Sequence, residues 1–195
     1  MATAATRRGT TVAGMPVGRR TPRGRKRWYL AHTYEGREEK ACEKVRKIIP
    51  SELLEDAFVM RREQVKKVHG EWVTLTRLMY PEYVVVVTKD VAALDKELRK
   101  LTFGVQIARG DTEHFAPMAD EACAWYERMM DANHTIRTST AHIVNGELQI
   151  KDGPLMGQES RVTSINRRKC FCTVAVTDGG GGFTEAVPMV VPFKS

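Results

Sequence analysis

The chain has 195 residues, 42% of them apolar and 28% charged, and this size suits one or two globular domains. No apolar run approaches the ~20 residues of a spanning helix, and the N-terminus lacks the apolar segment of a secretory signal. Four scattered cysteines do not form the framework of a disulfide-rich secreted scaffold. Composition therefore argues against a membrane or secreted protein and predicts a cytoplasmic one.

The formal net charge of +7 is concentrated at the N-terminus. Residues 1–27 hold eight of the 31 Lys and Arg residues and no acid, which leaves 23 basic against 24 acidic residues in the body. Residues 1–26 have hardly any large apolar side chain, so we expect a disordered basic arm. Three interpretations of this arm stay open: contacts with phosphate backbones, a solubilising tail, or an over-extended reading frame starting upstream of Met15.

The first half of the body alternates strand-like and helical patterns. We predict a strand at 27–32, an amphipathic helix at 38–49 that Pro50 ends, and a hairpin of residues 57–68 and 71–80 turning at His69-Gly70. The run "YVVVVT" from Tyr83 lacks polar interruption, which favours a central strand covered on both faces. A helix at 90–101 capped by Asp90, a strand at 105–108 and a helix at about 118–130 follow.

The second half contains only short strand patterns. Residues 131–145 are polar and lack helical period, so we predict a linker there. The runs "LQI", "SRVTSI", "CFCTVAV" and "AVPMVV" are separated by glycine-containing turns, which is typical of a small five-stranded barrel. Cys170, Cys172, Val174 and Val176 stand at every second position and so share one face of a strand, which favours a buried core position for the two cysteines. A metal site is the alternative, but a structural zinc site usually needs a second pair of ligands, and the sequence offers none.

No group of residues has the pattern of a catalytic or cofactor site. The five histidines are dispersed without paired ligand spacing, and the acids near Glu38 begin a predicted helix, where they favour the helix dipole. We therefore predict no enzymatic activity, no catalytic residue, no cofactor and no metal.

Three stretches resemble the NusG/Spt5-type transcription elongation factors. "WYLAHTYEGREEK" is similar to that family's opening strand, turn and helix, and "RLMYPEYVVVV" to its aromatic-Pro-Gly-Tyr strand entry, with Glu82 at the usual glycine. "LQIKDGPLMGQESRVTSINRRKCFCTVAV" looks like a KOW motif, and within it "DGPLMGQES" and "INRRKC" are closer to the LoaP-type antitermination paralogues than to the general factor.

The resemblance implies an α+β protein of two domains. Residues 27–130 are expected to form an NGN-type α/β sandwich with a mainly antiparallel sheet that binds RNA polymerase. After the linker at 131–145, residues 146–195 are expected to form a small SH3-like five-stranded KOW β-barrel. A monomer is the default expectation.

The resemblance also assigns binding residues. Contact with the clamp helices of the largest RNA polymerase subunit falls on Met79, Tyr80, Pro81 and Tyr83, of which Tyr80 and Tyr83 suit a binding hot spot. The alternative is that Met79 and Tyr83 line the domain's own core.

The KOW domain is expected to contact RNA or a regulatory partner. Cations at Lys151, Arg161, Arg167, Arg168 and Lys169 could hold the phosphates of a nascent RNA hairpin, and bridging to upstream DNA is a further expectation. An ordinary solvated turn is the alternative. Two other functions remain open: the general housekeeping NusG factor, and a ribosome-associated KOW protein that binds RNA.

Overall fold

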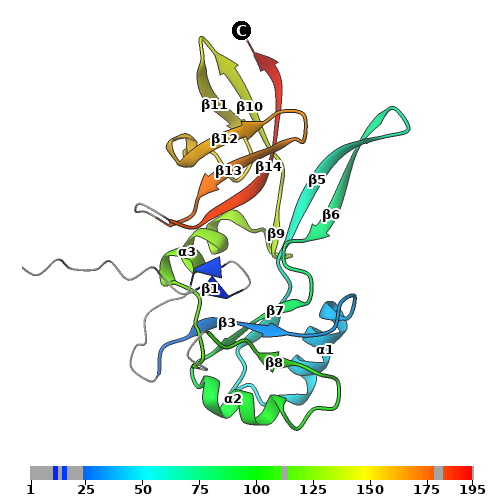
Figure 1. The fold of residues 1–195 in the computed structure, drawn as a ribbon, viewed down its shortest axis with the longest axis vertical. Helices are drawn as coiled ribbons and strands as arrows, with labels where there is room; N and C mark the ends of the chain where they lie inside the picture. Colours follow the sequence, from blue (N-terminus) through cyan, green and yellow to red (C-terminus); the bar gives the residue numbers. More distant parts are fainter. Residues whose placement is uncertain (1–10, 13–14, 17–23, 111–113, 178–181, 195) are drawn as a thin grey trace, which may run out of the picture. The chain divides into compact units, whose positions relative to one another are not determined.

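The computed structural model describes residues 11–12, 15–16, 24–110, 114–177 and 182–194. Its contacts divide the chain into two compact units (Figure 1). Unit 1 comprises Met1–Ala57 with Glu82–Asp120, and unit 2 comprises Phe58–Pro81 with Glu121–Ser195. Within the described residues, no helix combines the length and apolarity needed to cross a bilayer.

Unit 1 is built on a four-stranded sheet in the order β4-β7-β3-β8. Its strands are β3 (Arg27–His32), β4 (Asp56–Phe58), β7 (Tyr83–Thr88) and β8 (Gln106–Ile107). The β3 and β7 strands pair antiparallel along their whole length. The valines of β7 are all buried, so the prediction of a central strand at Tyr83–Thr88 is confirmed.

Two helices in unit 1 follow the predicted patterns. Helix α1 (Glu38–Ile48) buries Ala41, Cys42 and Val45, which recur at helical spacing on one face. Helix α2 (Val91–Leu98) begins after Asp90, whose carboxylate accepts a hydrogen bond of 3.0 Å from the Ala93 N–H. Both predicted helices are confirmed.

The range predicted to be a disordered arm lies largely outside the described residues. Within it, β1 (Thr11–Val12) pairs antiparallel with β2 (Met15–Pro16), and the Met15 side chain is buried. Arg25 lies 3.1 Å from Asp120, and Lys26 pairs with Glu55. These few described residues of the arm are thus ordered, while its role stays a prediction.

Unit 2 contains a long hairpin, β5 (Arg61–Val68) and β6 (Glu71–Leu78). His69 and Gly70 connect the strands with φ of 49° and 92°, the pair of positive values that a tight two-residue hairpin turn requires. The predicted hairpin is confirmed. Strand β9 (Thr135–Ile136) adds to β5 in parallel.

Unit 2 also contains a five-stranded sheet in the order β11-β10-β14-β13-β12. The strands are β10 (Ser139–Val144), β11 (Glu147–Asp152), β12 (Val162–Asn166), β13 (Phe171–Ala175) and β14 (Thr184–Lys194). A 3-10 turn, η1 (Glu159–Arg161), precedes β12. Cys170, Cys172, Val174 and Val176 are buried, as the alternation predicts. The sheet fits the predicted small barrel, and the mixed, mostly antiparallel α+β fold class is confirmed.

The range predicted to be a linker contains regular structure. Strand β10 occupies 139–144 and pairs antiparallel with β11 and parallel with β14. Its polar composition does not prevent this, because its partners satisfy the backbone and only alternate side chains face the core. In unit 2 the hairpin and α3 (Asp120–Met129) group with this sheet, so the division at 27–130, 131–145 and 146–195 stays a prediction.

Candidate functional site

The predicted polymerase-binding residues follow β6 and begin β7, where the chain passes from unit 2 to unit 1. Met79 is 8% exposed and its N–H donates to the Met60 carbonyl at 2.8 Å. Its burial agrees with the alternative that Met79 is a core residue. Pro81 is exposed, and Tyr80 and Tyr83 are half-buried.

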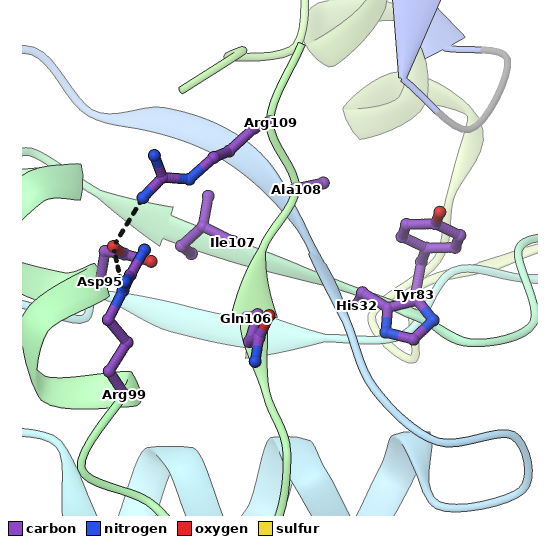
Figure 2. Close-up of a pocket in the computed structure, with 8 residues that line it drawn as sticks. All are labelled: His32, Tyr83, Asp95, Arg99, Gln106, Ile107, Ala108 and Arg109. Carbon is purple, nitrogen blue, oxygen red and sulfur yellow. Dashed lines mark hydrogen bonds and ion pairs between the residues drawn. The ribbon is translucent and has the colours of Figure 1, made fainter. Parts of the chain in front are cut away.

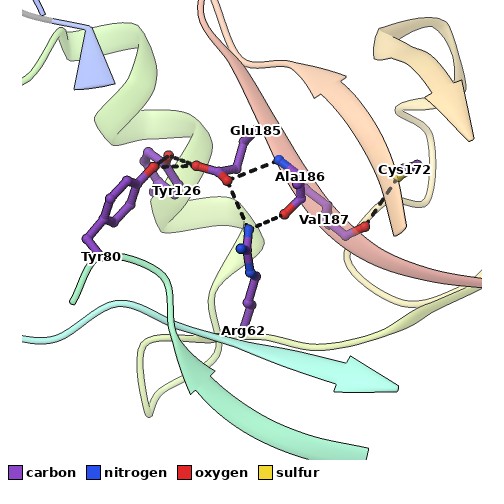
Figure 3. Close-up of polar contacts among 7 residues, drawn as sticks. All are labelled: Arg62, Tyr80, Tyr126, Cys172, Glu185, Ala186 and Val187. Atoms are coloured by element: carbon purple, nitrogen blue, oxygen red, sulfur yellow. Dashed lines mark hydrogen bonds and ion pairs between the residues drawn. The ribbon is translucent and has the colours of Figure 1, made fainter. Parts of the chain in front are cut away.

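The Tyr80 side chain belongs to a polar cluster in unit 2 (Figure 3). Its hydroxyl lies 2.9 Å from the Tyr126 hydroxyl, and both tyrosines donate to the Glu185 carboxylate, Tyr126 at 2.9 Å. The same carboxylate pairs with Arg62 at 3.1 Å. Burial, reinforced by the nearby Glu185 charge, raises the pKa of Tyr80 and of Tyr126 well above the ordinary tyrosine value. The two phenols therefore stay protonated donors at neutral pH.

The Tyr83 side chain lines an open hollow of about 390 Å³ in unit 1 (Figure 2). One end holds Tyr83 and His32, whose rings meet edge to face with centroids 5.5 Å apart. At the other end the buried Asp95 carboxylate accepts from Arg99 at 2.8 Å and from Arg109 at 3.3 Å. The hollow thus has an accessible aromatic end and a charged end, a combination suited to binding a protein surface.

Glu82, between the two tyrosines, has a backbone that suits glycine. Its φ is 66°, in the left-handed region that few side chains adopt. The Glu82 N–H donates to the buried Glu38 carboxylate at 2.8 Å, and its carbonyl accepts from the Thr33 N–H at 2.8 Å. The side chain is exposed, so its charge is not desolvated within unit 1.

The "GPLMGQE" segment packs inside unit 2. Leu155 is fully buried, and the Gln158 side chain accepts a 3.0 Å hydrogen bond from the indole N–H of Trp125 on α3. Gly153 has a φ of 98°, and a Cβ there would lie 2.6 Å from the Ser139 Cα. These residues fix the turn against α3 and β10, which is a structural role.

The basic residues predicted to hold RNA have different surroundings. Arg167, Arg168 and Lys169 are exposed in the turn between β12 and β13. Arg161 instead donates to the Ala175 and Val176 carbonyls at 3.2 and 3.1 Å. Lys151, on β11, donates to the Gln149 side chain at 2.8 Å. The turn is therefore the part of this set that presents its cations together.

Sequence reasoning did not identify Tyr126, Glu185, Trp125 or Gln158 as parts of these clusters. Tyr126 and Glu185 are 59 positions apart, and Trp125 and Gln158 are 33 apart, so no local spacing signals either contact. Among the residues that the structure describes, no group of three or more His, Cys, Asp or Glu side chains could hold a metal ion.

Residues 26–125 match the NusG family, described as "Transcription termination factor nusG". The "Transcription termination/antitermination protein NusG" of Staphylococcus carnosus (strain TM300) is 28% identical over 160 residues, which cover 78% of this chain and 87% of that protein.

A solved structure titled "Domain interaction in Thermotoga maritima NusG" is 14% identical, with a TM-score of 0.41, and the match covers 84% of this chain and 94% of that one. The family match spans more than half of the 195 residues. The chain therefore belongs to the NusG family of transcription termination and antitermination factors.

Proposed function

We propose that this protein is a transcription elongation and antitermination factor that binds the clamp helices of the largest RNA polymerase subunit through the segment Met79–Tyr83. The observation that carries the proposal is the position of Tyr83. Its half-buried ring lines an open hollow, braced by His32, in unit 1. A braced aromatic ring loses little conformational entropy on binding, which is a property of hot-spot residues.

The four residues have separate roles in this proposal. Pro81 is exposed and Tyr83 is accessible, so they make the direct contact. Met79 is buried, and its N–H donates to the Met60 carbonyl, so it anchors the start of the segment and does not meet the partner. The Tyr80 hydroxyl is engaged with Tyr126 and Glu185, which leaves its ring as the part available to a partner.

The polymerase contact is tested by binding of purified RNA polymerase to the immobilised full chain. Tyr83→Ala should weaken retention about tenfold or more, as expected for a hot-spot aromatic. Tyr83→Phe keeps the ring and should retain most of the affinity. The matched control is Tyr34→Ala, because Tyr34 is 60% exposed in unit 1 and does not line the hollow. Equal retention by Tyr83→Ala and Tyr34→Ala would reject the site.

The second part of the proposal concerns RNA. The motifs "DGPLMGQES" and "INRRKC" favour a LoaP-type antitermination factor over the general housekeeping NusG, with the KOW domain contacting a nascent RNA hairpin. The exposed turn at Arg167, Arg168 and Lys169 supports this contact, because three adjacent cations can hold successive phosphates. Lys151 and Arg161 have partners within unit 2 and make a smaller contribution.

The RNA contact is tested by hairpin binding at two salt concentrations. Arg167→Gln with Arg168→Gln should weaken binding and flatten its salt dependence, since each lost phosphate contact removes about one released counterion. The control variant is Lys40→Gln with Lys47→Gln, which neutralises two exposed lysines of α1. Equal binding by both double variants would remove the RNA contact and leave a protein partner for this domain.

A further inference from the structure

An open groove of about 440 Å³ lies in unit 2 between residues of the β5–β6 hairpin and of the β12–β13 turn. Figure 1 labels the four strands. The hairpin contributes Gln64, Val65, Lys66, Lys67 and Trp72, and the turn contributes Arg168, Lys169 and Phe171. Four of these eight residues are cationic, two are aromatic and none is acidic. The groove therefore joins residues about a hundred positions apart into one basic, aromatic surface.

The four cations of the groove form no ion pair with a carboxylate of the described residues. Two other arginines of unit 2 do form ion pairs, Arg62 with Glu185 at 3.1 Å and Arg137 with Asp131 at 2.7 Å. Among the described residues, no carboxylate lies within ion-pair distance of Lys66, Lys67, Arg168 or Lys169. Their side chains are exposed, so their charge is available to an anionic ligand.

Trp72 is the most exposed large apolar side chain among the described residues, at 61%. It lies directly opposite Lys67 in the antiparallel pairing of β5 and β6, with Lys66 opposite Val73. An indole held on a regular hairpin next to a lysine offers a flat face for a base and a charge for the adjoining phosphate. A purely electrostatic surface would not need the tryptophan.

The wall of the groove formed by Phe171 is fixed in place. The Arg62 guanidinium lies 5.3 Å from the Phe171 ring centroid, and Arg62 also donates to the Ala186 carbonyl at 2.7 Å and to Glu185. This restraint holds the ring before any ligand binds, which reduces the entropy that binding costs.

We propose that this groove binds a single-stranded polynucleotide, with a base stacked on Trp72 and flanking phosphates held by Lys66 and Lys67 from the hairpin and by Arg168 and Lys169 from the turn. The inference deepens the proposed RNA contact, with which it shares the last two residues. It adds the hairpin as a second binding element and selects unpaired strands, because stacking on Trp72 needs an exposed base face.

The test uses the full chain and fluorescein-labelled oligouridylate of about 12 nucleotides, followed by fluorescence anisotropy. Trp72→Leu should weaken binding about tenfold. The oligonucleotide should quench the tryptophan fluorescence of the wild type and leave that of the variant unchanged. Lys66→Gln with Lys67→Gln should weaken binding and reduce the slope of log K against log salt by about 1.4.

Two control variants match these changes within unit 2. Phe193→Leu removes another exposed aromatic ring, 50% exposed, and Arg77→Gln with Arg128→Gln removes two exposed cations outside the groove. Both controls should bind oligouridylate like the wild type. Oligodeoxythymidylate of equal length distinguishes the source: equal affinity indicates recognition of base and phosphate alone, and weaker affinity indicates an added contact with the RNA 2′-hydroxyl.

The inference is overturned if the Trp72 and Lys66/Lys67 variants bind oligouridylate like the controls, or if duplex RNA or oligoglutamate competes as well as the single strand. Arg167 does not line the groove, so it separates the two proposals. Loss of RNA-hairpin binding in Arg167→Gln with normal oligouridylate binding in Trp72→Leu would retain the turn contact and reject the groove. The reverse pattern would retain the groove and reject the turn contact.

Discussion

The two ends of one short stretch, residues 153–159 and residues 167–169, differ in what they contact. The first is packed: Leu155 is fully buried and Gln158 is 6% exposed, joined to Trp125. The second is exposed, and its three cations have no carboxylate partner among the described residues. The difference shows that a single sequence motif can combine a structural part with a part available for binding.

The comparison gives each part a different expected response to mutation. Changes in the packed part should alter the free energy of unfolding, because they create cavities or strain. Changes in the exposed part should alter ligand binding and leave the free energy of unfolding nearly unchanged.

The largest loss in the free energy of unfolding is expected from a change at the contact between residues 153–159 and α3. Trp125 is 1% exposed and donates to Gln158, so Trp125→Ala removes a large buried ring and a hydrogen bond. We expect a loss of about 3–5 kcal/mol in the free energy of unfolding. Urea unfolding followed by circular dichroism measures it, and a loss below about 1 kcal/mol would show that α3 does not depend on this contact.

The next largest loss in the free energy of unfolding is expected from a substitution at Gly153. An Ala Cβ would lie 2.6 Å from the Ser139 Cα, a backbone atom, and the φ of 98° is strained for any residue with a side chain. Gly153→Ala should therefore cost about 2–3 kcal/mol. Gly157→Ala is the control, because a Cβ there meets nothing within 4 Å and only the φ of 74° is unfavourable. Equal losses for the two variants would mean that contact with β10 is unimportant.

The elements of the fold were predictable where patterns were local. The period-two burial at Cys170–Val176, the His69-Gly70 turn and the helix beginning after Asp90 all follow from neighbouring residues. Strand β10 was not predictable from local patterns, because its polar side chains suggested a linker and its partners β11 and β14 come later in the chain. A parallel pairing with β14 has no local signal.

The candidate sites were predictable only in part, for the same reason. The aromatic segment and the basic turn could be found from sequence, but their surroundings could not. Glu185 receives hydrogen bonds from Tyr80 and Tyr126, which are 105 and 59 positions away. Likewise, nothing local places Trp72 in the same groove as Lys169.

Alkaline pH tests the burial of Tyr80, which lies beside Tyr126 of α3 and donates to Glu185 of β14. The pKa of Tyr80 and of Tyr126 is raised by burial and by Glu185, so the folded state keeps both protons above the ordinary value of about 10. This stability is fully present below pH 10 and is lost as pH rises above it, by up to about 1.4 kcal/mol per pH unit for each tyrosine. Tyr80→Phe should make the fall in unfolding free energy less steep between about pH 10 and pH 11. An unchanged slope would mean that Tyr80 ionises equally in both states.

The smallest effect on stability is expected in the exposed part. Arg167→Gln with Arg168→Gln removes two solvated cations without opening a cavity, so the free energy of unfolding should change by less than about 0.5 kcal/mol. Urea unfolding of this variant and of Trp125→Ala in the same buffer compares the stability effect of the exposed residues 167–169 with that of the contact between residues 153–159 and α3. A loss above about 1 kcal/mol would mean that the turn stabilises unit 2, and any RNA-binding defect of the variant would then reflect folding as well as charge.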